Sequence, residues 1–201
     1  CEFNMVKVAV FASGTGSNFE KLVTYEKENK NCSYNIAILI TDIESAKVIE
    51  KAKKLGIVTY FVNPKNFDTK EDFENKIVEI LNLHNIELIA LAGYMRILGK
   101  PLLNSYLNKI INIHPSLLPK YPGKSGITDA FLNKAEKTGV TIHYVDSGID
   151  TGKIITQEEL TIEPNWSMDE LEESIHKIEH RIYPLTLNKI CIELKNNLLN
   201  I

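Results

Sequence analysis

Residues 6–18 read VKVAVFASGTGSN, an apolar and β-branched run followed by a turn with two glycines. The run from Val6 to Phe11 predicts a buried β-strand, because it is apolar almost throughout and ends at turn-forming residues. A helix is expected to begin near Ser17 and Asn18, directly after the turn. The stretch therefore predicts a strand–turn–helix unit, the first part of a parallel β-sheet that is covered by helices.

The same alternation of apolar runs and amphipathic segments continues along the chain. Further strands are expected at residues 36–41, 58–62, 88–92, 110–114, 140–145 and 153–160. Helices are expected at residues 46–55, 69–85, near 102–107, after Gly126 and from Ser167, where Ser167 and Glu170 form a capping box. Pro184 predicts a break or kink in that last helix. The order predicts an α/β fold, an open and mostly parallel Rossmann-like sheet flanked by helices, with a C-terminal β-strand segment and a long terminal helix.

The composition is that of a soluble globular protein, with 44% hydrophobic and 24% charged residues among 201. Values in this range exclude an intrinsically disordered chain. The net charge of −3 gives no basic surface of the kind that binds nucleic acid or an anionic membrane. No apolar run approaches the ~18 residues that a membrane-spanning helix needs, so no membrane partner is expected.

The three cysteines, Cys1, Cys32 and Cys191, are far apart in the sequence. They form neither a disulfide framework nor a Cys-x-x-Cys pair, and they favour a reducing compartment, the cytoplasm. Residues 1–4 lack the features of a signal peptide and are expected to be a remnant that precedes a natural start at Met5. Residues 5–201 are expected to form one catalytic domain, and no pattern predicts an oligomeric state.

The turn with Gly14 and Gly16 predicts a site for a single phosphate group. The glycines allow close approach of the backbone, and the N-terminus of the following helix offers free N–H groups to an anion. The turn lacks the Lys of a P-loop, which makes a nucleoside triphosphate with magnesium a poor fit. It also carries Phe19 where a dinucleotide fingerprint has its third glycine, which disfavours a pyrophosphate. An ordinary strand-to-helix turn is the alternative.

Asn112 and His114 lie two residues apart in the strand expected at residues 110–114. Positions two apart project from the same face of a strand, and Pro115 favours an extended His114. An amide donor beside a titratable imidazole suits a carbonyl group whose oxygen becomes negative during addition. The pair therefore indicates catalysis, although the same spacing also occurs by chance in strands.

Asp146 and Asp150 lie in the glycine-containing segment 146–152, after the strand expected at residues 140–145. Such a segment is typical of a functional site and also of an ordinary turn. A carboxylate near His114 would favour the protonated imidazolium. The sequence leaves open which of the two aspartates reaches the histidine.

His176, Glu179 and His180 match the inverted zinc-protease pattern H-x-x-E-H on the last expected helix. A catalytic zinc needs a third protein ligand, and Glu193 is the one side-chain carboxylate that follows. Because Glu193 belongs to the same helical tail, no metal is expected. His143 is expected at the surface or in the core, without a functional role.

Several motifs, in order along the chain, resemble the phosphoribosylglycinamide formyltransferases over residues 6–185. They are SGTGSN at residues 13–18, LAGYMRIL at 91–98, NIHPSLLPKYPG at 112–123, DTG at 150–152, and EH at 179–180 before YP at 183–184. The resemblance implies an enzyme that transfers a formyl group from 10-formyltetrahydrofolate to the amine of glycinamide ribonucleotide in purine synthesis. It implies these two small molecules as ligands and no metal.

The resemblance also implies roles for individual residues. Asn112 and protonated His114 would stabilise an oxyanion, and Asp150 would sustain the protonated histidine and help to relay a proton. The residues that would bind the phosphate and ribose of the nucleotide are Gly16, Ser17, Asn18 and Glu179. The residues that would bind the folate are Lys70, Met95, Arg96, Ile97, Leu98 and Asn112.

Two places depart from the family pattern, since residues 124–128 lack a histidine that the family commonly has and His176 replaces the usual Lys or Gln. The enzyme alternatives are formyltetrahydrofolate hydrolase and other folate-dependent formyltransferases, acting on methionyl-tRNA or sugar nucleotides, which usually carry a further domain. A non-catalytic nucleotide-binding module is the alternative from another class. It would explain the glycine-rich turn, but it would not require Asn112, His114 and Asp150 together.

Overall fold

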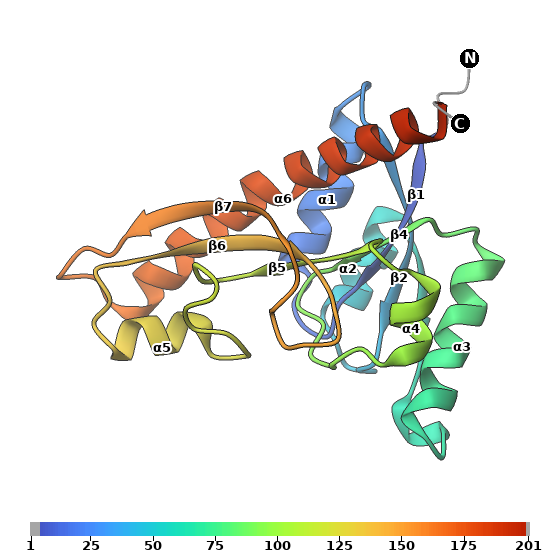
Figure 1. The fold of residues 1–201 in the computed structure, drawn as a ribbon, viewed down its shortest axis with the longest axis horizontal. Coiled ribbons are helices and arrows are strands. Elements are labelled where there is room, and N and C mark those ends of the chain that lie inside the picture. The colour runs from blue at the N-terminus through green and yellow to red at the C-terminus, as the bar shows by residue number, and fades with distance from the viewer. Residues whose placement is uncertain (1–4, 200–201) are drawn as a thin grey trace.

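The computed structural model describes residues 5–199, with side chains to residue 197, so the remnant expected at residues 1–4 lies outside it. Its centre is a seven-stranded sheet in the order β3-β2-β1-β4-β5-β6-β7 (Figure 1). The strands are β1 (Val6–Phe11), β2 (Tyr34–Thr41), β3 (Val58–Phe61), β4 (Leu88–Leu91), β5 (Ile110–His114), β6 (Lys137–Tyr144) and β7 (Ile154–Thr161). The strands β1 to β5 pair in parallel, and β6 and β7 pair antiparallel. The predicted open, mostly parallel sheet is confirmed.

Helices connect the strands and cover both faces of the sheet (Figure 1). They are α1 (Ser17–Glu28), α2 (Val48–Leu55), α3 (Lys70–Leu83), α4 (Lys100–Ser105), α5 (Gly126–Leu132) and α6 (Met168–Leu199), with a short 3-10 turn at Pro64–Asn66. Helix α1 packs against α6, and α3 packs against α4. Each strand and helix expected from the sequence is present, but most of the observed boundaries differ from the expected ones.

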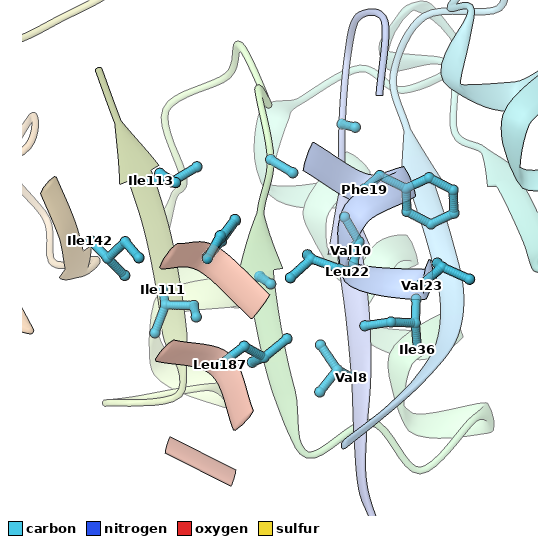
Figure 2. Close-up of a cluster of buried hydrophobic side chains, with 14 of the residues drawn as sticks. Val8, Val10, Phe19, Leu22, Val23, Ile36, Ile111, Ile113, Ile142 and Leu187 are labelled. Carbon is cyan, nitrogen blue, oxygen red and sulfur yellow. The ribbon is translucent and has the colours of Figure 1, made fainter. Parts of the chain in front are cut away.

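Strand β1 shows why the sheet is buried on both faces. Val8 and Val10 belong to the cluster that also contains Phe19 of α1 and Leu187 of α6 (Figure 2). Phe11 belongs to the cluster on the opposite face, which α3 and α4 cover. Each fully buried Val or Phe side chain contributes about 1.5–3 kcal/mol, so burial on both faces stabilises the parallel strands.

Helix α6 begins at Met168, directly after Ser167, the first residue of the predicted capping box. The Ser167 N–H donates to Glu170 Oε2 at 2.7 Å, and the Glu170 N–H donates to Ser167 Oγ at 3.3 Å. These two bonds satisfy N–H groups that a helix N-terminus leaves free, and the capping box is confirmed. Trp166 packs against the core beside this start, as a packing residue would.

The predicted break at Pro184 is wrong, because α6 continues through it to Leu199. Tyr183, directly before the proline, is fully buried, and its hydroxyl donates to the Leu91 carbonyl at 2.6 Å. Leu187, one turn further, is also fully buried. Packing of both turns against the sheet outweighs the hydrogen bond that Pro184 cannot make.

The carboxyl ends of β1, β4 and β5 lie side by side, since these strands are neighbours in the sheet. The segments that follow them are residues 12–16, 92–99 and 115–125, which contain the motifs singled out in the sequence. Ligands of open α/β sheets bind at this edge. Among residues 5–199, no helix is both long and apolar enough to cross a lipid bilayer.

Candidate active site

A cavity of about 540 Å³ opens at the carboxyl ends of β4 and β5. Small-molecule sites commonly have volumes of about 300–1,000 Å³. The predicted site residues that line it are Asn18, Met95, Arg96, Ile97, Leu98, Asn112, His114, Asp150 and Glu179. Gly16, Ser17 and Lys70 are not part of this lining, and Lys70 is the first residue of α3. The fold thus brings residues from five separate segments of the chain to one cavity.

The glycine-rich turn brings the N-terminus of α1 to this edge of the sheet. Gly16 has a φ of +74°, and a Cβ at this position would lie 2.3 Å from Cγ2 of Val48, so the turn requires glycine. No side chain caps α1 at Gly16, which leaves the first N–H groups of the helix suited to an anion. Two residues on, Asn18 Nδ2 donates to Glu179 Oε2 at 3.3 Å and links this end of α1 to α6.

His114 is 4% exposed, and both of its ring nitrogens face oxygen atoms. Nε2 lies 2.8 Å from the Tyr121 carbonyl oxygen, and Nδ1 lies 3.5 Å from Asp150 Oδ2. A neutral imidazole has one N–H and can satisfy one acceptor, whereas the imidazolium has two. The ring of His114 lies between two oxygen acceptors, one of which belongs to the Asp150 carboxylate. Asn112, two residues earlier on β5, lines the same cavity.

Asp150, rather than Asp146, is the aspartate beside His114. Its Oδ2 also accepts the Gly123 N–H at 2.7 Å, and its side chain is 13% exposed. Burial alone would raise the pKa of Asp150, but the His143 imidazole, the Gly123 N–H and His114 outweigh it and hold the pKa below its ordinary value. Asp150 is therefore an anion at neutral pH.

Asp146 stabilises the loop that carries Asp150. Its Oδ1 accepts the Thr151 hydroxyl at 2.7 Å and the Gly148 N–H at 2.9 Å, and these two hydrogen bonds lower the pKa of Asp146. Asp150 itself has a φ of +54°, a left-handed conformation that aspartate adopts more readily than most residues. The two carboxylates, which the pattern of the loop alone could not separate, thus have different surroundings.

His143 is a site residue that the sequence did not single out. It is 2% exposed on β6, directly opposite Asn112 of β5. Its Nε2 lies 3.4 Å from Asn112 Nδ2 and 3.6 Å from Asp150 Oδ1, and its Nδ1 lies 2.8 Å from the Tyr144 carbonyl oxygen. The ring therefore lies between the amide and the carboxylate of the predicted catalytic group and contacts both.

We expect His143→Ala to lower kcat by about tenfold, because the partly buried Asn112 amide and Asp150 carboxylate both lose their contact with the imidazole, at a cost of about 1.4 kcal/mol. His143→Gln, which keeps a hydrogen-bonding group, should retain more activity than alanine. Steady-state kinetics with a thermal unfolding control measures both. Equal activity of the wild type and His143→Ala would contradict this role.

A second cluster lies on α6, where the zinc-like pattern was noted. His176 Nδ1 lies 2.8 Å from Glu179 Oε2, and His176 Nε2 lies 3.4 Å from Glu172 Oε1. The hydrogen bond to Glu179 raises the pKa of His176 against the opposing effect of burial. Burial lowers the pKa of His180, which stacks on His176 with ring centroids 6.0 Å apart. Within residues 5–199, no three His, Cys, Asp or Glu side chains form a metal-binding group.

Comparisons with known proteins agree on one family. A family model described as formyl transferase matches residues 6–187. The phosphoribosylglycinamide formyltransferase of Bacillus subtilis (strain 168) is 48% identical over 186 residues, which cover 92% of this chain and 95% of that protein. The human trifunctional purine biosynthetic protein adenosine-3 is 34% identical over 189 residues, and the match covers 94% of this chain but 19% of that protein.

Solved structures give the same result. The crystal structure of glycinamide ribonucleotide transformylase 1 from Geobacillus kaustophilus has a TM-score of 0.90 and 44% identity, and the match covers 93% of this chain and 99% of that one. The phosphoribosylglycinamide formyltransferase from Streptococcus pneumoniae TIGR4 has a TM-score of 0.87 and 41% identity, with 92% and 99% covered. The chain therefore belongs to the formyl transferase family, among the phosphoribosylglycinamide formyltransferases.

Proposed function

We propose that this protein transfers the formyl group of 10-formyltetrahydrofolate to the amine of glycinamide ribonucleotide, a step of purine synthesis. The observation that carries the proposal is the meeting of Asn112, His114 and Asp150 at one cavity, in a chain of this family. These three residues supply an amide donor, an imidazole with two acceptors around it, and a carboxylate held as an anion.

The reaction is an acyl transfer through a tetrahedral intermediate. The substrate amine attacks the formyl carbon, a C–N bond forms, and the formyl oxygen becomes an oxyanion. Asn112 Nδ2 and protonated His114 donate to that oxygen, as the donors of an oxyanion hole do. The intermediate collapses when the bond to N10 of the folate breaks. The proton that the amine loses reaches N10, and Asp150 assists this transfer while it keeps His114 protonated.

The two substrates would approach the catalytic group from different sides. The nucleotide phosphate would bind at the start of α1, to Gly16, Ser17 and Asn18. Glu179 would accept a hydrogen bond from a ribose hydroxyl. The segment 95–98 would bind the folate, with Lys70 of α3 near its anionic tail. We propose that residues 5–201 form a single catalytic domain that acts in the cytoplasm on these small molecules, with neither nucleic acid nor membrane as partner.

The test is a steady-state assay of formylated ribonucleotide with each substrate varied in turn. The proposal predicts product only when glycinamide ribonucleotide and 10-formyltetrahydrofolate are both present, and saturation in each. Release of formate at the same rate with and without the ribonucleotide would instead identify a formyltetrahydrofolate hydrolase. Binding of the ribonucleotide without turnover would identify a nucleotide-binding module.

His176 gives the proposed nucleotide subsite a pH dependence. Because the pKa of His176 is raised, its positive charge is present below the ordinary value near 6.5 and is lost as the pH rises through the raised pKa. We expect the KM for the ribonucleotide to rise several-fold above that pH, because the proposed phosphate subsite loses a cation that is linked to it through Glu179 and Asn18. His176→Lys keeps its charge and should flatten the rise. Identical KM profiles of the two proteins from pH 6.5 to 9 would contradict the prediction.

A further inference from the structure

Asp42 is a buried carboxylate that the proposed mechanism does not use. It directly follows β2, is 7% exposed, and is not among the residues that line the cavity. A buried carboxylate is unfavourable unless it is paired, so its partners indicate its role. Both of its oxygens face groups that belong to, or are bonded to, the segment 93–98.

The first partner is Ser13, in the turn after β1. Its hydroxyl donates to Asp42 Oδ1 at 2.6 Å and accepts the Met95 N–H at 3.0 Å, so the three groups form a chain. The Ser13 N–H also donates to the Gly93 carbonyl at 3.0 Å. The turn that leads into α1 is therefore bonded to the segment 93–98 at two points, and Asp42 fixes the hydroxyl between them.

The second partner is Arg96. Its Nη1 lies 3.8 Å from Asp42 Oδ2, and its guanidinium lies over the Phe73 ring of α3, 5.1 Å from the centroid. The Arg96 side chain is 38% exposed, whereas that of Asp42 is 4% exposed. A pair with one buried member is screened less by water and salt than a pair on the surface. Asp42 therefore holds the one cation of this segment in a defined direction.

Tyr94 and Leu98 anchor the segment 93–98 in the core, but residues 95–97 between them are exposed and depend on such bonds. The segment has no helix or strand, and Met95 and Ile97 are 51% and 57% exposed. Irregular segments with few buried apolar contacts open locally at low cost. Every residue of the segment lines the cavity, so its order determines the shape of that wall.

We propose that Asp42 is a positioning residue for the folate side of the reaction: through Ser13 and Arg96 it orders the segment 93–98 that receives the formyl folate. Asp42 touches neither substrate. The inference rests on the proposed function, because it assigns this wall to the folate. It predicts that the charge of Asp42 governs the affinity for the folate and leaves the affinity for the ribonucleotide unchanged.

The test compares Asp42→Asn, Asp42→Ala and Ser13→Ala with the wild type in kcat and in the KM of each substrate. Asp42→Asn keeps an acceptor for the Ser13 hydroxyl and loses the charge opposite Arg96, so the KM for the folate should rise about tenfold. Asp42→Ala loses its contacts with both Ser13 and Arg96, so it should raise the KM for the folate further. In Asp42→Asn, kcat and the KM for the ribonucleotide should stay within about twofold of the wild type. The matched control is Glu159→Gln, which removes the charge of an exposed carboxylate paired with Lys137. It should change neither kcat nor the KM of either substrate.

A double-mutant cycle with Arg96→Ala tests the pairing directly. If Asp42 acts through Arg96, the Arg96→Ala change should raise the KM for the folate less in Asp42→Asn than in the wild type. The dissociation constant of tetrahydrofolate, measured by calorimetry, gives the same comparison without turnover, so a failure of the proposed transfer stays distinguishable. An unchanged dissociation constant in Asp42→Asn overturns the inference. An equal loss of affinity for both substrates, together with a lower Tm, also overturns it, since that pattern indicates a structural role only.

Discussion

Asp150→Asn is expected to lower kcat by about 10²-fold or more and to leave the protein folded. The asparagine would fill the same space and tolerates the left-handed backbone of this position, where φ is +54°. It would lack the negative charge that faces His114 at 3.5 Å and His143 at 3.6 Å. Without that charge, His114 loses the carboxylate beside its Nδ1 and the amine proton loses its proposed relay. Steady-state kinetics with circular dichroism as the folding control measures the effect.

Asp146→Asn is the matched control for this variant. It changes a carboxylate of the same loop, but Asp146 contacts Gly148 and Thr151 and no residue of the catalytic group. We expect a reduction in kcat of no more than several-fold, because the loop keeps most of its hydrogen bonds. Turnover like that of the wild type in Asp150→Asn, or equal losses in the two variants, would refute the role of Asp150.

Asn112→Ala is expected to lower kcat by about 10²- to 10³-fold, with little change in the KM of either substrate. Loss of one donor to a developing oxyanion costs this much because the donor acts mainly in the transition state. The side chain lies on β5 beside the cavity and is paired with His143 across the sheet, so its direction is fixed before substrate binds. Kinetics with both substrates saturating separates the loss of kcat from any loss of binding.

Asn112→Gln is the informative companion variant. It keeps the amide but moves it by one methylene, so a true oxyanion donor should lose most of its effect there as well. A loss that appears only in KM would indicate that Asn112 binds a substrate without stabilising the transition state.

The sheet could be predicted because its strands are apolar on both faces. In β1, Val8 and Val10 on one side and Phe11 on the other are all fully buried, and such continuous runs are typical of parallel strands between two layers of helices. The course of α6 could not be predicted in the same way. Pro184 breaks helices on local grounds, and the burial of Tyr183 and Leu187 that holds α6 together is a tertiary effect.

Local patterns alone could predict the site only where a single segment carries it, and the residues from other segments, such as Asp150 and Glu179, came from the family resemblance. Asn112 and His114 share a face of one strand, so their spacing already indicated a pair. The choice of Asp150 over Asp146 depends on a loop conformation, and the place of His143 depends on the register between β5 and β6. Asp42 is likewise visible only once β2 lies beside β1. These contacts join distant residues, and no local pattern encodes them.

The central claim, formyl transfer to the ribonucleotide amine, is tested most directly by following a ¹³C label in the formyl group of 10-formyltetrahydrofolate during a single turnover. The account predicts that the label appears in the formamide of the product ribonucleotide, one for each folate consumed, and that Asp150→Asn slows its appearance. Label that appears as free formate, at a rate that does not depend on the ribonucleotide, would contradict the account.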